Sequence, residues 1–339
     1  MTTRFKIVLG AAALSAGLAA GSGAAQAQAD FYKDKTINIY VGYSTGGGYD
    51  VYARTLSRFL GRHIPGNPTV IVTNMPGAGS LRAANWIYNV APKDGTVIGT
   101  VARGAAFDPL FGLPGTQFDA TKYTWIGSAN DEVSVCVSWH TSQVKTFDDL
   151  LTKEMIVGGT GGSADTDQFP KVINGVLGTK MKVIAGYPGG NDINLAMERG
   201  EVQARNNTWS SWKVTKPEWI KNGDIKILAY AGPKPKDLPG VPDVTALVKS
   251  DDDRRIVELI VSGTRLGRPL AFAGGVPEDR VKAVREAFMK TMADEDFLKE
   301  AAQMKIEVDP VRGEDMQKVV ADVLATPKHL AARARALIE

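Results

Sequence analysis

The residues most able to do chemistry form a glycine-rich segment, residues 42–50, with the sequence GYSTGGGYD. It lies between a predicted strand and a predicted helix. A helix N-terminus presents backbone N–H groups and the positive end of the helix dipole, which together favour an anion such as a carboxylate. Consecutive glycines let a ligand approach the backbone closely. The segment is therefore a candidate anion-binding loop.

Two other interpretations of this segment stay open. Gly42-x-Ser44-x-Gly46 matches the nucleophile elbow of serine hydrolases, which also lies between a strand and a helix. Three glycines separate Ser44 from the helix, however, and the only candidate bases are His63, His140 and His329, none in a recognisable context. The segment could also be a tight strand–helix connection without any ligand.

A second glycine loop, residues 158–164 with the sequence GGTGGSA, also follows a predicted strand. It fits a dinucleotide fingerprint loosely, but no acidic residue stands at the end of the next strand to hold a ribose. No Walker A lysine follows either loop. Thr160 and Ser163 are better interpreted as hydroxyl donors beside backbone N–H groups, an arrangement that suits a carboxylate without a cofactor.

Aromatic residues accompany these loops. Tyr43, Tyr49 and Tyr187 lie in glycine turns, and Trp209 and Trp212 stand in a polar run, residues 206–212. Aromatic residues in such a run are more often core or interface than ligand contacts, but the polar neighbours here make a role as pocket walls about equally favoured.

The sequence contains no His, Cys, Asp and Glu cluster with the spacing of metal ligands. Asp165 and Asp167, like the acidic run 251–253, are interpreted as helix caps and solvated loop charges. We therefore expect neither a metal nor a cofactor.

Strand and helix patterns alternate along the chain. Short apolar runs predict strands, and residues with apolar spacing of three and four predict helices. Asp50 is the expected N-cap of the first helix. The expected strands are 36–41, 69–73, 96–101, 155–158, 182–185, 202–205 and 225–230, and the expected helices are 50–62, 81–90, 166–177, 192–199, 278–292 and 314–323. This alternation predicts an α/β fold with a parallel sheet covered by helices on both faces.

The N-terminus has the layout of a secretory signal peptide. Arg4 and Lys6 precede an uncharged apolar stretch, residues 7–20, and the sequence AQA at 27–29 fits a cleavage site. Cleavage after residue 29 would remove both basic residues and lower the net charge from +3 to +1. No further segment is apolar and long enough to span a bilayer. We expect the mature protein to be free in the periplasm.

Composition excludes some classes of protein. The 339 residues carry no long basic run, so no nucleic acid partner is expected. The single cysteine, Cys136, cannot pair within the chain and lies in an alternating strand-like run, where it is expected to be a small buried hydrophobe.

A set of short motifs, in order along the chain, resembles the solute-binding receptors of tripartite tricarboxylate transporters, which are type II periplasmic binding proteins. Residues 43–50 (YSTGGGYD) resemble that family's FAPGGGTD loop, and residues 74–80 (NMPGAGS) its NRPGAGG element. The later motifs are 92–96 (PKDGT), 159–165 (GTGGSAD), 185–189 (AGYPG) and 273–277 (AGGVP).

The resemblance implies two α/β lobes with the ligand between them. Lobe 1 would comprise residues 30–128 and 232–339, and lobe 2 residues 129–231. The implied contacts on lobe 1 are Tyr43, Ser44, Gly47, Gly48, Tyr49, Asp50, Gly79 and Ser80. Those on lobe 2 are Thr160, Gly161, Gly162, Ser163, Ala164, Tyr187, Asn191 and Trp209.

The chain departs from the family pattern at the site itself. Ser44-Thr45 replaces an Ala-Pro pair, Tyr49 replaces a threonine, and residues 207–212 replace an FDTLPS-like segment. We expect a monomeric receptor that binds a small organic carboxylate, either a di- or tricarboxylate or an aromatic acid, and delivers it to integral membrane transporter subunits. The alternatives are a serine hydrolase using Ser44 and a ligand-sensing receptor for a signalling partner.

Overall fold

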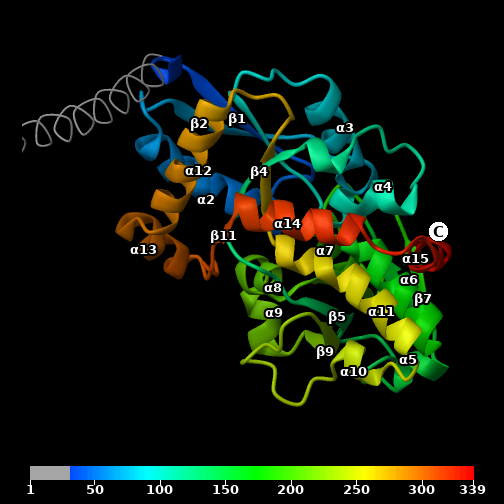
Figure 1. Ribbon diagram of the computed structural model, residues 1–339. Helices are drawn as coiled ribbons and strands as arrows, with labels where there is room; N and C mark the ends of the chain where they lie inside the picture. Colours follow the sequence, from blue (N-terminus) through cyan, green and yellow to red (C-terminus); the bar gives the residue numbers. More distant parts are fainter. Residues whose placement is uncertain (1–30) are drawn as a thin grey trace, which may run out of the picture.

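The computed structural model describes residues 31–339, so the predicted signal peptide lies outside the described residues. The chain forms two sheets, one above the other in Figure 1, each flanked by helices. The first sheet has the strand order β11-β4-β10-β3-β1-β2, and the second has the order β7-β6-β8-β5-β9. The strands are β1 Thr36–Val41, β2 Thr69–Asn74, β3 Val97–Thr100, β4 Thr124–Ser128, β5 Ser134–Trp139, β6 Met155–Gly158, β7 Met181–Ile184, β8 Ala204–Thr208, β9 Ile225–Ala231, β10 Pro269–Phe272 and β11 Val311–Arg312.

Both sheets are mixed. In the first sheet β1 pairs in parallel with β2 and β3, but β10 inserts antiparallel between β3 and β4. In the second sheet β6 pairs in parallel with β7 and β8, whereas β5 is antiparallel to β8 and β9. The α/β class is confirmed, but the expected parallel sheet is found only in part, because each sheet also contains antiparallel pairs. The antiparallel strands enter where the chain passes from one sheet to the other and returns.

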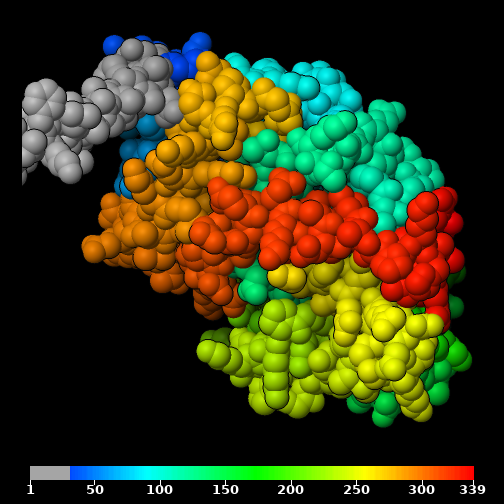
Figure 2. Space-filling model, in the orientation of Figure 1, coloured from blue at the N-terminus to red at the C-terminus, as the bar shows by residue number. Residues whose placement is uncertain are grey.

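The chain passes to the second sheet through residues 129–133 and comes back between β9 and β10. The bounds of the two lobes stay a prediction. Helices α11 and α15, which follow β9 in sequence, pack on α6 beside the second sheet. In Figure 2 the red C-terminal helices lie along the yellow α11, across the face where the two halves meet.

Helices cover both sheets. They are α2 Gly48–His63, α3 Leu81–Asn89, α4 Asp108–Phe111, α5 Asp149–Thr152, α6 Asp165–Leu177, α7 Gly190–Glu198, α8 Trp209–Thr215, α9 Pro217–Asn222, α10 Val244–Leu247, α11 Asp251–Val261, α12 Glu278–Met292, α13 Glu295–Gln303, α14 Gly313–Leu324 and α15 Lys328–Ile338. Short 3-10 turns η1 to η4 lie at Ala78–Ser80, Arg103–Phe107, Ala120–Lys122 and Ser262–Leu266. In the described part of the chain, no helix is both long and apolar enough to cross a bilayer.

Most expected elements are found within one or two residues of their predicted bounds. The clearest differences are at α2 and β8. Helix α2 begins at Gly48 with Gly47 as its N-cap, so the expected N-cap Asp50 lies in the first turn instead, where its carboxylate accepts a hydrogen bond from the Gly46 N–H at 2.9 Å. Strand β8 runs to Thr208, because its polar residues are buried between neighbouring strands rather than exposed in a turn.

Cys136 is buried in β5, as predicted. Its Sγ lies 3.9 Å from the Met181 sulfur, and burial raises the pKa of the thiol to about 12. The thiol is therefore protonated at neutral pH and behaves as a small apolar group.

Gly267, in the segment that returns the chain to the first sheet, is in close contact with the outgoing segment. Its φ is +53°, and a Cβ added there would lie 1.7 Å from the carbonyl oxygen of Asn130. The two segments that join the sheets can approach this closely only because residue 267 has no side chain.

Gly267→Ala is expected to lower the free energy of unfolding by more than 2 kcal/mol, the sum of a left-handed backbone penalty of about 1–2 kcal/mol and a steric clash with backbone. Gly240→Ala is the matched control, because Gly240 also has a positive φ of +77° but has no atom within 4 Å of the added Cβ. Thermal unfolding of the two variants compares them. Equal losses would contradict the steric argument.

Candidate functional site

A cavity lies between the two halves of the molecule. It encloses about 350 Å³ of atom-free space, counting the part that opens to solvent. Its walls come from the starts of α2, α6 and α7, from β8, and from the segment that leads into β10. The lining residues are Tyr43, Gly47, Gly48, Tyr49, Thr160, Asp165, Thr166, Gly190, Arg205, Asn207, Ser211 and Arg268.

Three helix N-termini converge on this cavity. Gly48 begins α2, Asp165 begins α6 and Gly190 begins α7, and all three line the cavity. None of these helices has a side-chain hydrogen bond at its N-cap. Each end contributes partial positive charge and N–H groups that a helix cannot satisfy internally, so together they favour an anion.

Arg205, on β8, adds a full positive charge. It is 4% exposed, and its Nη1 donates to the carbonyl of Gly190 and to Oδ1 of Asn194, both at 2.8 Å. No acidic group of the described residues lies within ion-pair distance of it, and its Nε has no hydrogen-bond partner among them. Burial lowers the pKa of this guanidinium to about 10, so it is still a cation at neutral pH.

A buried cation without a counter-ion costs free energy unless a ligand supplies the opposite charge. The guanidinium lies over the ring of Trp212, 5.3 Å from its centroid, which orients the side chain. Arg205 is therefore the strongest candidate to bind a carboxylate.

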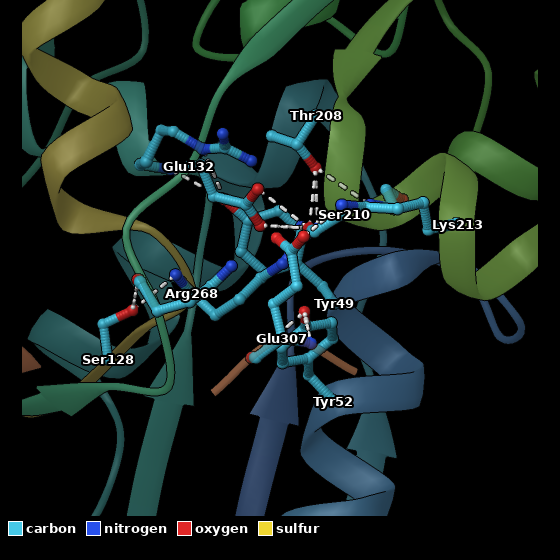
Figure 3. Close-up of polar contacts among 12 residues, drawn as sticks. Tyr49, Tyr52, Ser128, Glu132, Thr208, Ser210, Lys213, Arg268 and Glu307 are labelled. Carbon is cyan, nitrogen blue, oxygen red and sulfur yellow. Dashed lines mark hydrogen bonds and ion pairs between the residues drawn. The ribbon is translucent and has the colours of Figure 1, made fainter. Parts of the chain in front are cut away.

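Arg268, which precedes β10, contacts both halves (Figure 3). Its Nη2 lies 2.9 Å from the Glu132 carboxylate and donates to the hydroxyl of Thr208 at 2.7 Å. Ser210 donates to the same carboxylate at 2.6 Å. The charge of Arg268 is thus balanced by Glu132, although its Nε has no hydrogen-bond partner in the described chain.

Tyr49 packs between cationic groups. Its ring lies 4.7 Å from the guanidinium carbon of Arg268, and its hydroxyl accepts hydrogen bonds from the backbone N–H and the Nε of Arg103, at 3.1 and 3.3 Å. Tyr43 stacks against Tyr49 with 4.9 Å between ring centroids. These contacts fix both tyrosines as a wall of the cavity.

Five residues predicted from the sequence line the cavity. They are Tyr43, Gly47, Gly48, Tyr49 and Thr160. The other eleven predicted contacts are not among the residues that line it.

Ser44 and Asn191 lie where the first glycine loop meets the start of α7. The Ser44 hydroxyl donates to Asp192 at 2.5 Å, and its N–H donates to the carbonyl of Pro188 at 3.1 Å. Asn191 lies against Gly46. Tyr187 packs beside the tryptophan cluster of the second half. The contacts of Ser44 and Asn191 join the two halves.

Asp50 shapes the first loop from behind. Beyond its bond to Gly46, it pairs with Arg54 at 3.0 Å and accepts from the Asn74 side-chain amide at 2.8 Å. Asn74 also donates to the carbonyl of Tyr43 at 2.9 Å. The second motif, residues 74–80, therefore positions the first loop.

The other predicted glycine-loop residues pack against one another. Gly79 donates to the carbonyl of Thr160 at 2.8 Å across the two halves, and the Ser80 hydroxyl accepts from the N–H of Ala102 at 2.9 Å. A Cβ on Gly161 would lie 2.5 Å from the N of Gly79, so glycine is required for this crossing.

Gly162, Ser163 and Ala164 lead into α6 and do not line the cavity. The Gly162 carbonyl accepts from the side-chain amide of Gln168 at 2.9 Å, and Ala164 is the N-cap of α6. Trp209 also lies outside the cavity, where its indole N–H donates to Asp237 at 2.8 Å in a separate surface cleft.

The sequence did not predict seven of the lining residues. They are Asp165, Thr166, Gly190, Arg205, Asn207, Ser211 and Arg268. Asp165 was expected to be a solvated cap, and the structure shows instead that it is 9% exposed and lines the cavity. For these seven residues the sequence contained one local signal of a binding site: Arg205 is a charged residue within a predicted strand.

The hydrolase interpretation gains no geometric support from the described residues. The hydroxyl of Ser44 donates to Asp192, and none of the three histidines hydrogen-bonds to it. His63 pairs with Asp294 at 2.8 Å, far from the loop in the fold. The described chain also has no group of three or more His, Cys, Asp or Glu placed to hold a metal ion.

Asp108, the first residue of α4, is fully buried near the loop that precedes α6. Burial raises the pKa of this carboxyl to about 7, and the nearby Ser163 hydroxyl offsets only part of that effect. Neither carboxylate oxygen has a well-formed hydrogen bond within the described residues. Between about pH 4 and pH 7 the folded state therefore keeps a proton on this carboxyl group. The unfolded chain, in which the pKa is about 3.9, releases that proton over the same range.

Comparison with known proteins finds a curated relative that matches part of the chain. No model of a known protein family matches the sequence. The UPF0065 protein in the gbd 5′ region of Cupriavidus necator is 38% identical over 116 residues, which cover 34% of this chain and 32% of that protein. The match thus spans about a third of the relative's length.

Solved structures share the fold over most of the chain. The periplasmic binding protein BugD has a TM-score of 0.72 at 18% identity, over 89% of this chain and 98% of its own. MatC from Rhodopseudomonas palustris, with bound malate, has a TM-score of 0.68 at 14% identity, over 90% and 99%. A TctC solute-binding protein from Polaromonas has a TM-score of 0.57 at 20% identity, over 89% and 99%. The predicted fold of two helix-flanked sheets is therefore confirmed, and the structures that share it include proteins of the kind that the motifs resemble.

The buried Asp108 carboxyl makes stability depend on pH. Its raised pKa stabilises the folded state below pH 4, and this stabilisation is lost as the pH rises from about 4 to 7, at about 1.4 kcal/mol for each pH unit. Asp108→Asn is expected to raise the thermal midpoint at pH 8 and to leave it nearly unchanged at pH 4.

Asp119→Asn is the control for this effect. The pKa of Asp119 is lowered by hydrogen bonding to Thr121, so its replacement is not expected to raise the midpoint at pH 8. A destabilised Asp108→Asn variant at pH 8 would show that the ionised carboxylate is compensated in the folded protein.

Proposed function

We propose that this protein is a periplasmic solute-binding protein that captures a small organic carboxylate and delivers it to a membrane transporter of the tripartite tricarboxylate type. The supporting observation is the uncompensated Arg205 cation in a cavity that also receives three uncapped helix N-termini. A carboxylate would satisfy both features at once, because its oxygens accept from the guanidinium and from backbone N–H groups.

The comparisons support the same class of ligand. MatC is a structural neighbour with bound malate, and another neighbour from Rhodopseudomonas palustris has bound adipate. The fold places the cavity between two halves, as expected for a receptor that closes over its ligand. Export to the periplasm follows from the predicted signal peptide.

Delivery to a transporter, rather than signalling to a sensor, rests on the motif resemblance. Both roles require the same ligand-binding step, so the binding experiment below tests what they share. Uptake of the bound acid by cells that produce the protein together with the transporter subunits, and not by cells that lack it, distinguishes the two roles.

Arg205→Met is expected to weaken ligand binding at least 30-fold with little change in the stability of the free protein. Removing one partner of a buried charge pair costs about 2–5 kcal/mol of binding free energy, or roughly 30-fold to several thousand-fold in affinity. In the free protein, the lost hydrogen bonds are offset by removal of an unpaired buried charge. Arg205→Lys is expected to retain part of the affinity, since the charge remains but the planar fork is lost.

The measurement is a thermal-shift and calorimetric screen of the purified protein against small aliphatic, aromatic, hydroxy- and amino-substituted carboxylates. A ligand at a hundred times its Kd stabilises by about 2.7 kcal/mol. Arg199→Met is the matched control, because Arg199 lies exposed at the end of α7 and pairs with Glu201. Unchanged binding by Arg205→Met, or no binding of any acid by the native protein, would refute the proposal.

A further inference from the structure

Asp165 is the only acidic side chain among the described residues that line the cavity. The residue is 9% exposed, and its Oδ2 has no hydrogen-bond partner in the described chain. A buried carboxylate oxygen without a donor is costly, and such an atom in a cavity indicates a donor on the ligand.

The nearest cation does not satisfy this oxygen. Nη1 of Arg103 lies 3.6 Å from the Asp165 Oδ2, beyond hydrogen-bond length. Arg103 is held in place by its own contacts, since its backbone N–H and its Nε both donate to the hydroxyl of Tyr49. The ion pair therefore leaves a gap, and the carboxylate keeps its capacity to accept a hydrogen bond.

Arg205 and Asp165 line the same cavity with opposite charge. They are not within ion-pair distance, yet Asp165 is the acid whose charge acts most strongly on Arg205. The cavity consequently has a cationic part, formed by Arg205 and the start of α7, and an anionic side chain, Asp165, whose charge opposes the partial positive charge of the α6 N-terminus. A ligand with both charges could lie between them without leaving either unpaired.

Building on the proposed function, we propose that the ligand is a small amino acid, whose carboxylate binds Arg205 and whose ammonium group donates to Asp165. Asp165 is then the residue that determines specificity for an amino-substituted acid over the same acid without nitrogen. The ammonium group suits this position better than a hydroxyl, because it donates hydrogen bonds and also neutralises the charge of a desolvated carboxylate.

The test uses matched series of ligands that differ only at one substituent. These are alanine, lactate and propionate; aspartate, malate and succinate; and phenylalanine, 3-phenyllactate and 3-phenylpropionate. Isothermal titration calorimetry of the native protein is expected to show at least tenfold tighter binding of the amino acid than of both partners in the series that fits the cavity.

The Asp165→Asn variant is expected to lose at least tenfold in affinity for the amino acid and to bind the unsubstituted acid as well as, or better than, the native protein. Asp315→Asn is the matched control, because Asp315 also stands in the first turn of a helix and pairs with an arginine, Arg312, but is exposed. Circular dichroism and the thermal midpoint check folding. If Asp165→Asn does not fold, the ligand series on the native protein still decides.

The outcomes separate this inference from the proposed function. Equal or tighter binding of hydroxy or unsubstituted acids by the native protein would overturn the role of Asp165 while the carboxylate receptor stands. An equal loss for all three members of a series in Asp165→Asn would also overturn it, because it would indicate a structural role. No binding by any acid would refute the proposed function, and the inference with it.

Discussion

The burial of three arginine side chains between the two sheets is the constraint on which the rest of the structure depends. Arg103, Arg205 and Arg268 are each no more than 4% exposed. Desolvating a cation costs several kcal/mol unless an opposite charge and hydrogen bonds compensate. Glu132 compensates Arg268, and Asp165 lies near Arg103 without a hydrogen bond. Arg205 has only neutral acceptors, so the interior retains positive charge that the protein itself does not balance.

Close approach of the two halves keeps these charges out of water. Figure 3 shows that the Arg268 network includes residues of α2, of the crossover at Glu132 and of the β8–α8 junction. At the other end, Gly79 and Gly161 let two loops touch backbone to backbone. The same interactions that bring the sheets together therefore give the cavity its low dielectric, in which an ion pair with a ligand is stronger than in water.

The sequence predicted the backbone of the site better than its side chains. Glycine spacing and apolar runs are local signals, so β1, the loop before α2 and the loop before α6 could be placed from them. Arg205 and Arg268 could not be placed this way, because their burial depends on packing between distant segments. Arg205 is covered by α7 and Trp212, and Arg268 reaches the cavity only because β10 inserts antiparallel between β3 and β4. Trp209 illustrates the same limit, since a polar local sequence does not reveal that its indole donates to Asp237, which does not line the cavity.

The distribution of the cavity residues between the halves connects binding to closure. Arg205 and Asp165 belong to elements of the second sheet, whereas the start of α2 and Arg268 belong to the first. A ligand can contact all of them only when the halves are together, so its affinity for the closed arrangement exceeds its affinity for either half alone. Each additional charge-assisted hydrogen bond contributes about 1.5–3 kcal/mol, and a ligand shifts a conformational equilibrium by its difference in affinity for the two states. Two such bonds from the first half would favour closure by roughly a hundred-fold or more. If the protein has the proposed function, the side chains of the second half would select the ligand, and those of the first half would convert its presence into closure.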